Sequence, residues 1–320
     1  MKPQSTFSKP WRGQPYGKPS VLFTLPELMG LDSPAKPPVR PAGGLRDRPR
    51  VGAPIRPNLG LAASYAGRIN AIVDEMHKSV IHWVRASYRA NPPATMAYDD
   101  LSWRSLTNAM KGIATRWLAR FDEMAEKLAR HFAQSVGRRT DAALRKILTD
   151  GGMMLREWKL TDAQRDAIGA IVQENVSLIK SIPRQYLARV EQDVMRSVAA
   201  GRDLKQLEKD LQEHYGVTRD RARLIALDQN NKATAFLRRV RAIETGTFTW
   251  IWMHSSGRKQ PRPTHLAAGK RGQRFDIREG WFDPHEGRKI QPGELIHCGC
   301  TCRPVLPGIP SGAVIRGFAA

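Results

Sequence analysis

The chain has 320 residues, and its 41% hydrophobic content is enough for one to three packed domains, which excludes a wholly disordered protein. Its 52 lysines and arginines against 30 acidic residues give a net charge of +22, beyond the magnitude of about 2 to 8 usual for a small soluble domain. This charge indicates an anionic partner, with nucleic acid favoured over an anionic membrane surface. We expect no membrane span and a cytoplasmic start, because no apolar run approaches about 18 residues and no secretory signal is readable.

Residues 1–60 hold more than half of the chain's 22 prolines and an excess of basic residues. Proline is poorly tolerated inside helices and central strands, so this stretch predicts an extended basic arm and not a folded domain. We expect the arm to lie along DNA or a neighbouring subunit. The alternative is an untethered basic leader.

Residues 61–200 predict a helical domain, because apolar residues recur at spacings of three and four. The expected helices cover about 61–90, 103–136 and 138–150, followed by one capped by Thr161 and one that begins at Pro183. Their apolar stripes are expected to face a core and not a cofactor.

Residues 201–308 begin with a short helix that is expected to end at Tyr215-Gly216, and Thr218 is expected to cap a longer one. One face of this longer helix is basic, and its cations are candidates for contact with phosphates, although such a run more commonly forms a solvated face. The residues of this face are Arg219, Arg223, Lys232, Arg238, Arg239 and Arg241.

The sequence after Gly246 predicts a small, irregular β-containing module, followed by a tail over 309–320. Residues 247–254 alternate β-branched and aromatic residues with others, which is typical of a strand, and short extended pieces are expected near Ile290 and over 300–306. The fold class is therefore α+β: an extended proline-rich arm, a mainly helical middle region and this module.

A module so poor in apolar runs usually requires a staple. Three cysteines within five residues cannot form a disulfide framework, but in an extended segment they would share one face. Thiolate and imidazole together suit a structural, tetrahedral Zn²⁺. The predicted ligands are His265, Cys298 and Cys300, with Cys302 or His285 as the fourth. The alternative is a metal-free set of reduced thiols with a hydrogen-bonded histidine.

Four motifs occur in a recognisable order in the last third of the chain. They are Arg221-Ala222-Arg223-Leu224-Ile225-Ala226, a strand with Trp250, Arg262-Pro263-Thr264-His265, and Pro292-Gly293-Glu294 with Cys298-Gly299-Cys300-Thr301. With these motifs, residues 201–307 resemble the bacteriophage Mu F-like minor head protein family, also called the phage head morphogenesis domain. The chain departs from the family pattern in lacking an acidic residue just before Arg262 and in having Gly299 between the cysteines.

The resemblance implies a minor capsid protein found in the virion, inside the head near the portal, and in the host cytoplasm during assembly. Its implied partners are the portal oligomer and the major capsid or scaffold proteins, in procapsid assembly, packaging or ejection. The charge independently favours non-specific binding to the phage's double-stranded DNA.

Other functions are less well supported by the sequence. A metal-dependent nuclease would have to use His254, His265, His285 or His297 with Asp276, Asp283 or Glu286. There is no HExxH, P-loop or Gly-x-Ser-x-Gly motif, so we expect the protein not to be an enzyme. A host nucleic-acid-binding protein with a zinc-stapled module, and an arm that binds an acidic portal or scaffold surface, remain as alternatives.

Overall fold

The structure, a computed structural model, describes residues 49–90, 100–155, 158–201, 203–255, 261–306 and 314–315. Most of the predicted arm and of the predicted tail lies outside these residues. The α+β class with a mainly helical middle and a small strand-containing module is confirmed.

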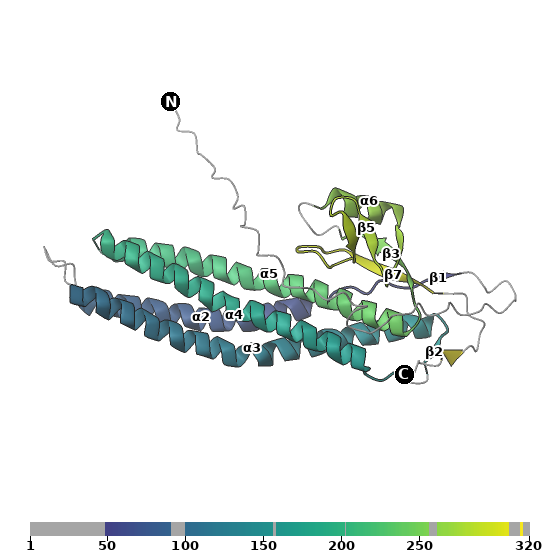
Figure 1. Cartoon of the computed structure of the whole chain (residues 1–320), viewed down its shortest axis with the longest axis horizontal. Coiled ribbons are helices and arrows are strands. Elements are labelled where there is room, and N and C mark those ends of the chain that lie inside the picture. Colours follow the sequence, from purple (N-terminus) through teal and green to yellow (C-terminus); the bar gives the residue numbers. More distant parts are fainter. Residues whose placement is uncertain are drawn as a thin grey trace, which may run out of the picture. The chain divides into compact units, whose positions relative to one another are not determined.

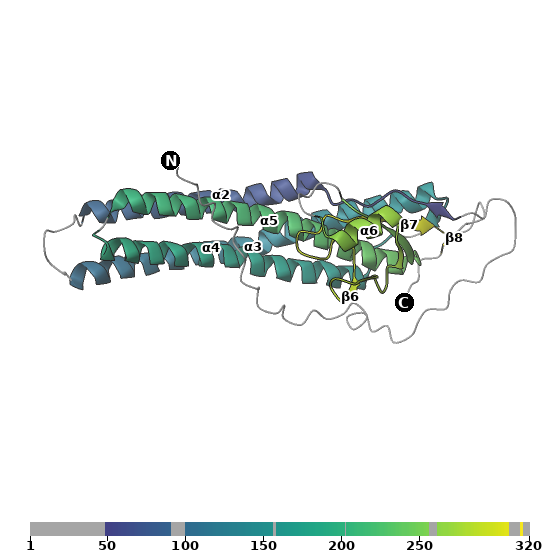
Figure 2. The same cartoon turned by 90° about the horizontal axis from the view of Figure 1, so that it is seen from above.

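Four long helices lie side by side along most of their lengths (Figures 1 and 2). They are α2 (Leu59–Ala90), α3 (Asp100–Asp150), α4 (Asp162–Ala199) and α5 (Leu204–Glu244). Helix α3 packs against the other three, and α5 packs against both α2 and α4. The predicted apolar stripes face this contact, since Ile69, Phe121 and Ile179 are fully buried.

Three helix breaks predicted from the sequence are wrong, because Gly137, Pro183 and Gly216 all lie inside continuous helices. Packing along a whole helix face outweighs the local cost of one glycine or proline. A Cβ at residue 137 would lie 3.5 Å from Ile168 Cδ1, which is ordinary packing contact across helices. Thr218 does not cap a helix: its hydroxyl donates to the His214 carbonyl inside α5.

Other helix boundaries follow their local chemistry. The Thr161 hydroxyl accepts a hydrogen bond from the Gln164 N–H at 3.2 Å, so the predicted cap of α4 is confirmed. Asp203 caps α5 in the same way, accepting from the Gln206 N–H at 3.1 Å.

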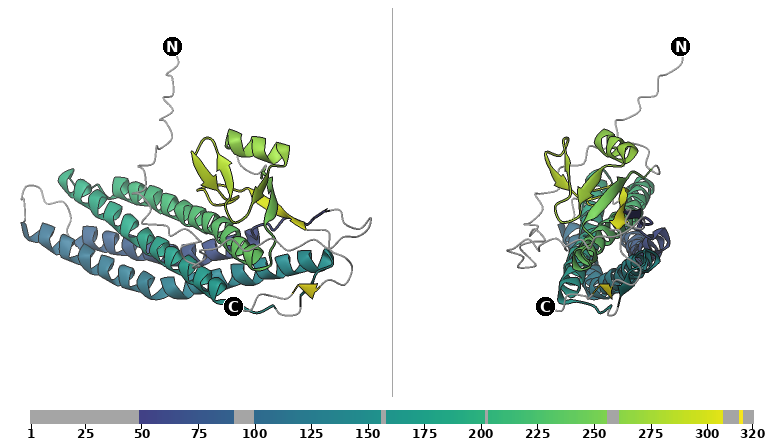
Figure 3. Two further views of the ribbon diagram at one scale, coloured as in Figure 1. Left: turned by 45° about the vertical axis from the view of Figure 1, so that its right-hand side comes forward. Right: turned by 90° about the vertical axis from the view of Figure 1, so that its right-hand side faces the viewer.

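The β-containing module follows α5 (Figure 3). Its main sheet has the order β1-β7-β3-β4 with antiparallel neighbours, built from β1 (Arg50–Val51), β7 (Thr301–Leu306), β3 (Thr249–Met253) and β4 (Arg274–Asp276). Helix α6 (Pro263–Arg271) packs on β3, and β5 (Trp281–Asp283) forms a hairpin with β6 (Arg288–Ile290). A parallel pair joins β2 (Met154–Leu155) to β8 (Val314–Ile315). The strands expected over 247–254, near Ile290 and over 300–306 are confirmed.

One hydrophobic core joins the module to the helices. Trp250 and Trp252 of β3 and Leu306 of β7 are buried with Leu144 and Leu148 of α3. The end of the predicted arm is part of this arrangement, because β1 pairs with residues 305–306 of β7. The module is therefore held by α3 and α5 and by the chain that precedes α2.

Candidate metal centre

His265 lies on the short helix α6, which begins with Pro263 and is followed by the capping residue Gly272 with φ of 59°. Its ring is buried, and Nε2 lies 3.1 Å from Oδ2 of the fully buried Asp283. In a neutral ring that donates from Nε2 to this carboxylate, the lone pair would be on Nδ1, the atom that a metal ion would take. Asp283 is held by the hydroxyl of Thr264 at 3.2 Å and the N–H of His285 at 2.9 Å.

Cys298 and Cys300 lie on the loop between β6 and β7, residues 291–300, which is called the cysteine loop below. Helix α5 holds this loop by hydrogen bonds. Asn231 donates its side-chain N–H to the Cys298 carbonyl at 3.0 Å, and the His297 N–H donates to Asp228 at 2.9 Å. His297 has a positive φ of 59°, and the Cys298 N–H closes a turn onto the Leu295 carbonyl at 2.9 Å. The chain therefore turns at Ile296 and His297, directly before Cys298.

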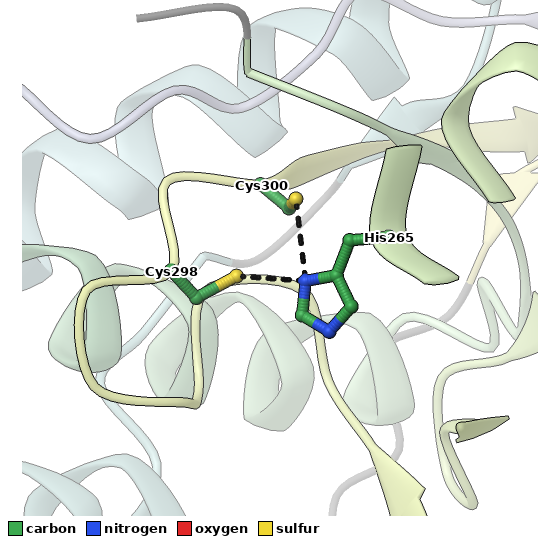
Figure 4. A group of neighbouring side chains, drawn as sticks. All are labelled: His265, Cys298 and Cys300. Carbon is green, nitrogen blue, oxygen red and sulfur yellow. Dashed lines mark hydrogen bonds between the residues drawn. The ribbon is translucent and has the colours of Figure 1, made fainter. Parts of the chain in front are cut away.

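The loop brings two cysteine sulfurs to His265 (Figure 4). The His265 Nδ1 atom lies 3.5 Å from Cys298 Sγ and 3.7 Å from Cys300 Sγ, and all three ligand atoms are within 4.8 Å of one another. All three side chains are buried. Two thiols and an imidazole nitrogen directed at one point form a group that could hold a metal ion, and these donor types suit Zn²⁺.

The two sulfurs perturb each other's ionisation. The hydrogen bond from Cys300 is the main influence lowering the pKa of the Cys298 thiol, and His265 lowers it further against the effect of burial. The Cys298 sulfur and burial in turn raise the pKa of Cys300. The pair therefore favours one thiolate beside one thiol, and a bound cation would take the place of the remaining proton.

The structure does not place either predicted fourth ligand in this group. Cys302 lies on β7 opposite Trp252, two residues beyond Cys300, and burial raises its pKa to about 11. Its sulfur is not among the ligand atoms that lie within 4.8 Å of one another. His285 has a side chain that is 71% exposed, with its ring beside Glu286.

The remaining residues of the recognised motifs hold the module together. Arg262 donates to the Ile296 carbonyl at 3.2 Å and so connects α6 to the cysteine loop. The Trp250 indole donates to the Thr247 carbonyl at 2.7 Å, and the Pro292 carbonyl accepts from Arg238 at 3.0 Å. Gly293 has φ of 91°, and a Cβ there would meet the carbonyl oxygens of Asn231 and Cys300 at 3.3 Å.

Two of the predicted DNA contacts are corrected by the structure. Arg238 is 1% exposed and donates to Thr301 Oγ1 at 3.1 Å as well as to the Pro292 carbonyl. Arg241 is 4% exposed and donates to both carboxylate oxygens of Asp141. Neither guanidinium can reach a phosphate, because each is buried and hydrogen-bonded to groups of its own chain. The basic pattern on α5 did not reveal which cations face the core.

The side chains of the other four predicted DNA contacts are more exposed than those of Arg238 and Arg241, to different extents. Arg239 is half-buried, donates to the Arg278 carbonyl, and has its pKa lowered by burial. Arg219 is half-buried beside Tyr215, whose hydroxyl is 3.0 Å away, and Lys232 lies 3.0 Å from Asp228. Arg223 is exposed and pairs only locally with Asp220.

Residues 188–303 match the sequence model of the family described as Phage Mu protein F like protein, which confirms the resemblance found in the sequence. An uncharacterized protein of Haemophilus influenzae is 33% identical over 141 residues, which make up 44% of this chain and 30% of that relative. The match therefore spans less than a third of the relative's length. No solved structure matches the chain. Among the described residues, no helix is long and apolar enough to cross a bilayer.

Proposed function

We propose that this chain is a minor head protein of a tailed phage, located inside the virion near the portal, where it acts in procapsid assembly, packaging or ejection. The observation that carries the proposal is the Mu F-like match over residues 188–303, which contains the cysteine loop and α6. The match points to a structural family of head morphogenesis and not to an enzyme family. Its partners would be the portal oligomer and the major capsid or scaffold proteins.

The protein is further proposed to bind the phage's double-stranded DNA without sequence preference. The net charge of +22 supports this, because clustered cations displace counterions from the phosphate backbone. On α5 the cations that support phosphate contact are Arg219, Arg223 and Lys232, since their side chains reach the surface. Arg238 and Arg241 are not part of this surface.

A structural Zn²⁺ held by His265, Cys298 and Cys300 is proposed to staple the module. The burial of all three ligands supports a structural role, since a catalytic site keeps an open position for substrate or water. The carboxylate of Asp283 supports metal binding by orienting the His265 ring, which is the usual outer partner of a metal-bound histidine.

The assembly role is tested by co-expressing the full chain with the portal protein of the same phage and isolating the complex at low and at high salt. A complex that persists at high salt supports a protein interface, since salt screens simple charge attraction. The proposal is overturned if the two proteins separate under all conditions and the chain is absent from purified virions.

DNA binding is tested by measuring affinity for an arbitrary duplex over a range of salt concentrations. Arg223→Ala is expected to weaken binding equally for unrelated sequences and to reduce the salt slope by about 1. Lys127→Ala on α3 is the control, because Lys127 is 76% exposed and lies outside the proposed surface. A wild-type chain with no salt-dependent affinity would refute this part of the proposal.

A further inference from the structure

The cysteine loop and α6 supply three ligands, whereas structural zinc sites are almost always four-coordinate. Neither Cys302 nor His285 lies in this group of ligand atoms. A fourth donor must therefore come from another segment that borders the two sulfurs.

His254, the residue after β3, borders Cys300. In the β3–β7 ladder Trp252 pairs with Cys302 and Met253 with Thr301, so the same register continued by one residue places His254 opposite Cys300. The His254 Nδ1 atom lies 3.5 Å from Cys300 Sγ. The backbone pairing that places Cys302 opposite Trp252 thus also places His254 beside the sulfur of Cys300.

The distances match those of a tetrahedral zinc site. With Zn–S of about 2.3 Å and Zn–N of about 2.05 Å, a sulfur and a nitrogen on neighbouring corners are about 3.6 Å apart. The three sulfur–nitrogen distances here are 3.5, 3.7 and 3.5 Å. Cys300 therefore already has both histidine nitrogens at the separation that a shared ion would impose.

The packing of α6 brings the two histidines together. A Cβ on Gly269 would lie 2.4 Å from the His254 Cβ and 2.8 Å from its backbone nitrogen. Helix α6 can therefore approach His254 only because residue 269 has no side chain.

We propose that His254 Nδ1 completes a closed zinc site with His265 Nδ1, Cys298 Sγ and Cys300 Sγ, and that Cys302 is not a ligand. The inference rests on the zinc staple proposed above. His254 lies outside the group in which all ligand atoms are within 4.8 Å, so a bound ion would draw its half-exposed ring toward Cys298 and His265. The site would then join the end of β3, α6 and the cysteine loop.

The test uses the full chain, purified without tag or chelator, with zinc measured by elemental analysis and the site probed by Co²⁺ absorption. One zinc per chain is expected in the wild type, and Cys302→Ala and His285→Ala should keep it with an unchanged Co²⁺ spectrum. His254→Ala should lower zinc affinity by about 100-fold or more, beyond the 10- to 100-fold loss typical of outer-shell changes. His254→Cys should retain zinc and strengthen the thiolate-to-cobalt absorption, a change that a merely structural histidine would not produce.

The outcomes separate the two proposals. Loss of zinc in His265→Ala but not in His254→Ala would overturn the fourth ligand and leave the staple standing. Loss of zinc in Cys302→Ala with a changed Co²⁺ spectrum would also overturn it. A wild type that takes up neither zinc nor Co²⁺ would overturn both proposals.

Discussion

Replacing Arg241 tests whether this cation of α5 stabilises the fold or binds DNA. Its guanidinium donates to both carboxylate oxygens of Asp141 on α3 at 2.8 and 2.7 Å and to Glu244 at 3.0 Å. It also donates to the Lys159 carbonyl at 3.1 Å and lies 4.5 Å from the ring centre of Trp158. This one side chain therefore connects α3, α5 and the segment before α4.

The expected cost of Arg241→Met follows from the carboxylates that it leaves behind. Removing one partner of a buried ion pair typically costs about 3 to 5 kcal/mol, because the other charge stays desolvated. Burial already raises the pKa of Glu244, and Arg241 is one of the groups that opposes this rise. Asp141 keeps hydrogen bonds from Trp158 and Gln164, each at 3.2 Å, so we expect the lower end, about 3 kcal/mol.

The assay is urea unfolding followed by circular dichroism, with DNA affinity measured on the same samples. Arg223→Met is the matched control, because its exposed pair with Asp220 is worth less than about 1 kcal/mol. The control should lose DNA affinity and little stability, and Arg241→Met the reverse. The reasoning is refuted if Arg241→Met unfolds at the wild-type urea concentration and binds DNA more weakly.

Three further changes test other parts of the structure. Gly293→Ala should destabilise the protein by about 1 to 3 kcal/mol, because residue 293 has a positive φ. Gly216→Ala, inside α5, should instead stabilise it by about 0.5 to 1 kcal/mol. Equal melting temperatures of the two variants would contradict this. Leu144→Ala should cost about 2 to 5 kcal/mol in urea unfolding, and a near-neutral result would argue against the shared core. Burial acts to raise the pKa of Asp276, but hydrogen bonds from Arg278 bring it below 3.8. Asp276→Asn should therefore cost about 1 kcal/mol at pH 7, a difference that persists above pH 3.8 and disappears as the pH falls below the folded pKa; a pH-independent difference would contradict this.

The fold could be predicted where local chemistry decides it. Thr161 caps α4 as expected, and the alternation over 247–254 marks β3, because both signals act over a few residues. The continuity of α4 through Pro183 could not be read in the same way. Pro183 is buried in the helix bundle, and the packing that outweighs its missing N–H comes from residues distant in the sequence.

The metal centre shows the same division. Ligand chemistry alone identified His265, Cys298 and Cys300, which the structure brings together. The sequence suggested Cys302 or His285 as the fourth ligand. The proposed ligand His254 depends instead on the strand register that places it opposite Cys300 and on the turn at His297. The pattern Trp250-x-Trp252-x-His254 was the available signal, since it places the histidine on the strand face that reaches the cysteines.

The position of the centre explains why this module would need a metal. Trp250, Trp252 and Leu306 belong to one buried cluster with Leu144 and Leu148 of α3, so the sheet has apolar support from the helices. Helix α6 packs on β3, on the side of the sheet away from the long helices (Figure 3). The cysteine loop, by contrast, is bonded directly to Asn231 of α5. An ion shared by His265 and the two cysteines would thus connect the outermost element of the module to the helix bundle. Helix α6, of which Ala268 is the one buried apolar residue, gains most from such a link.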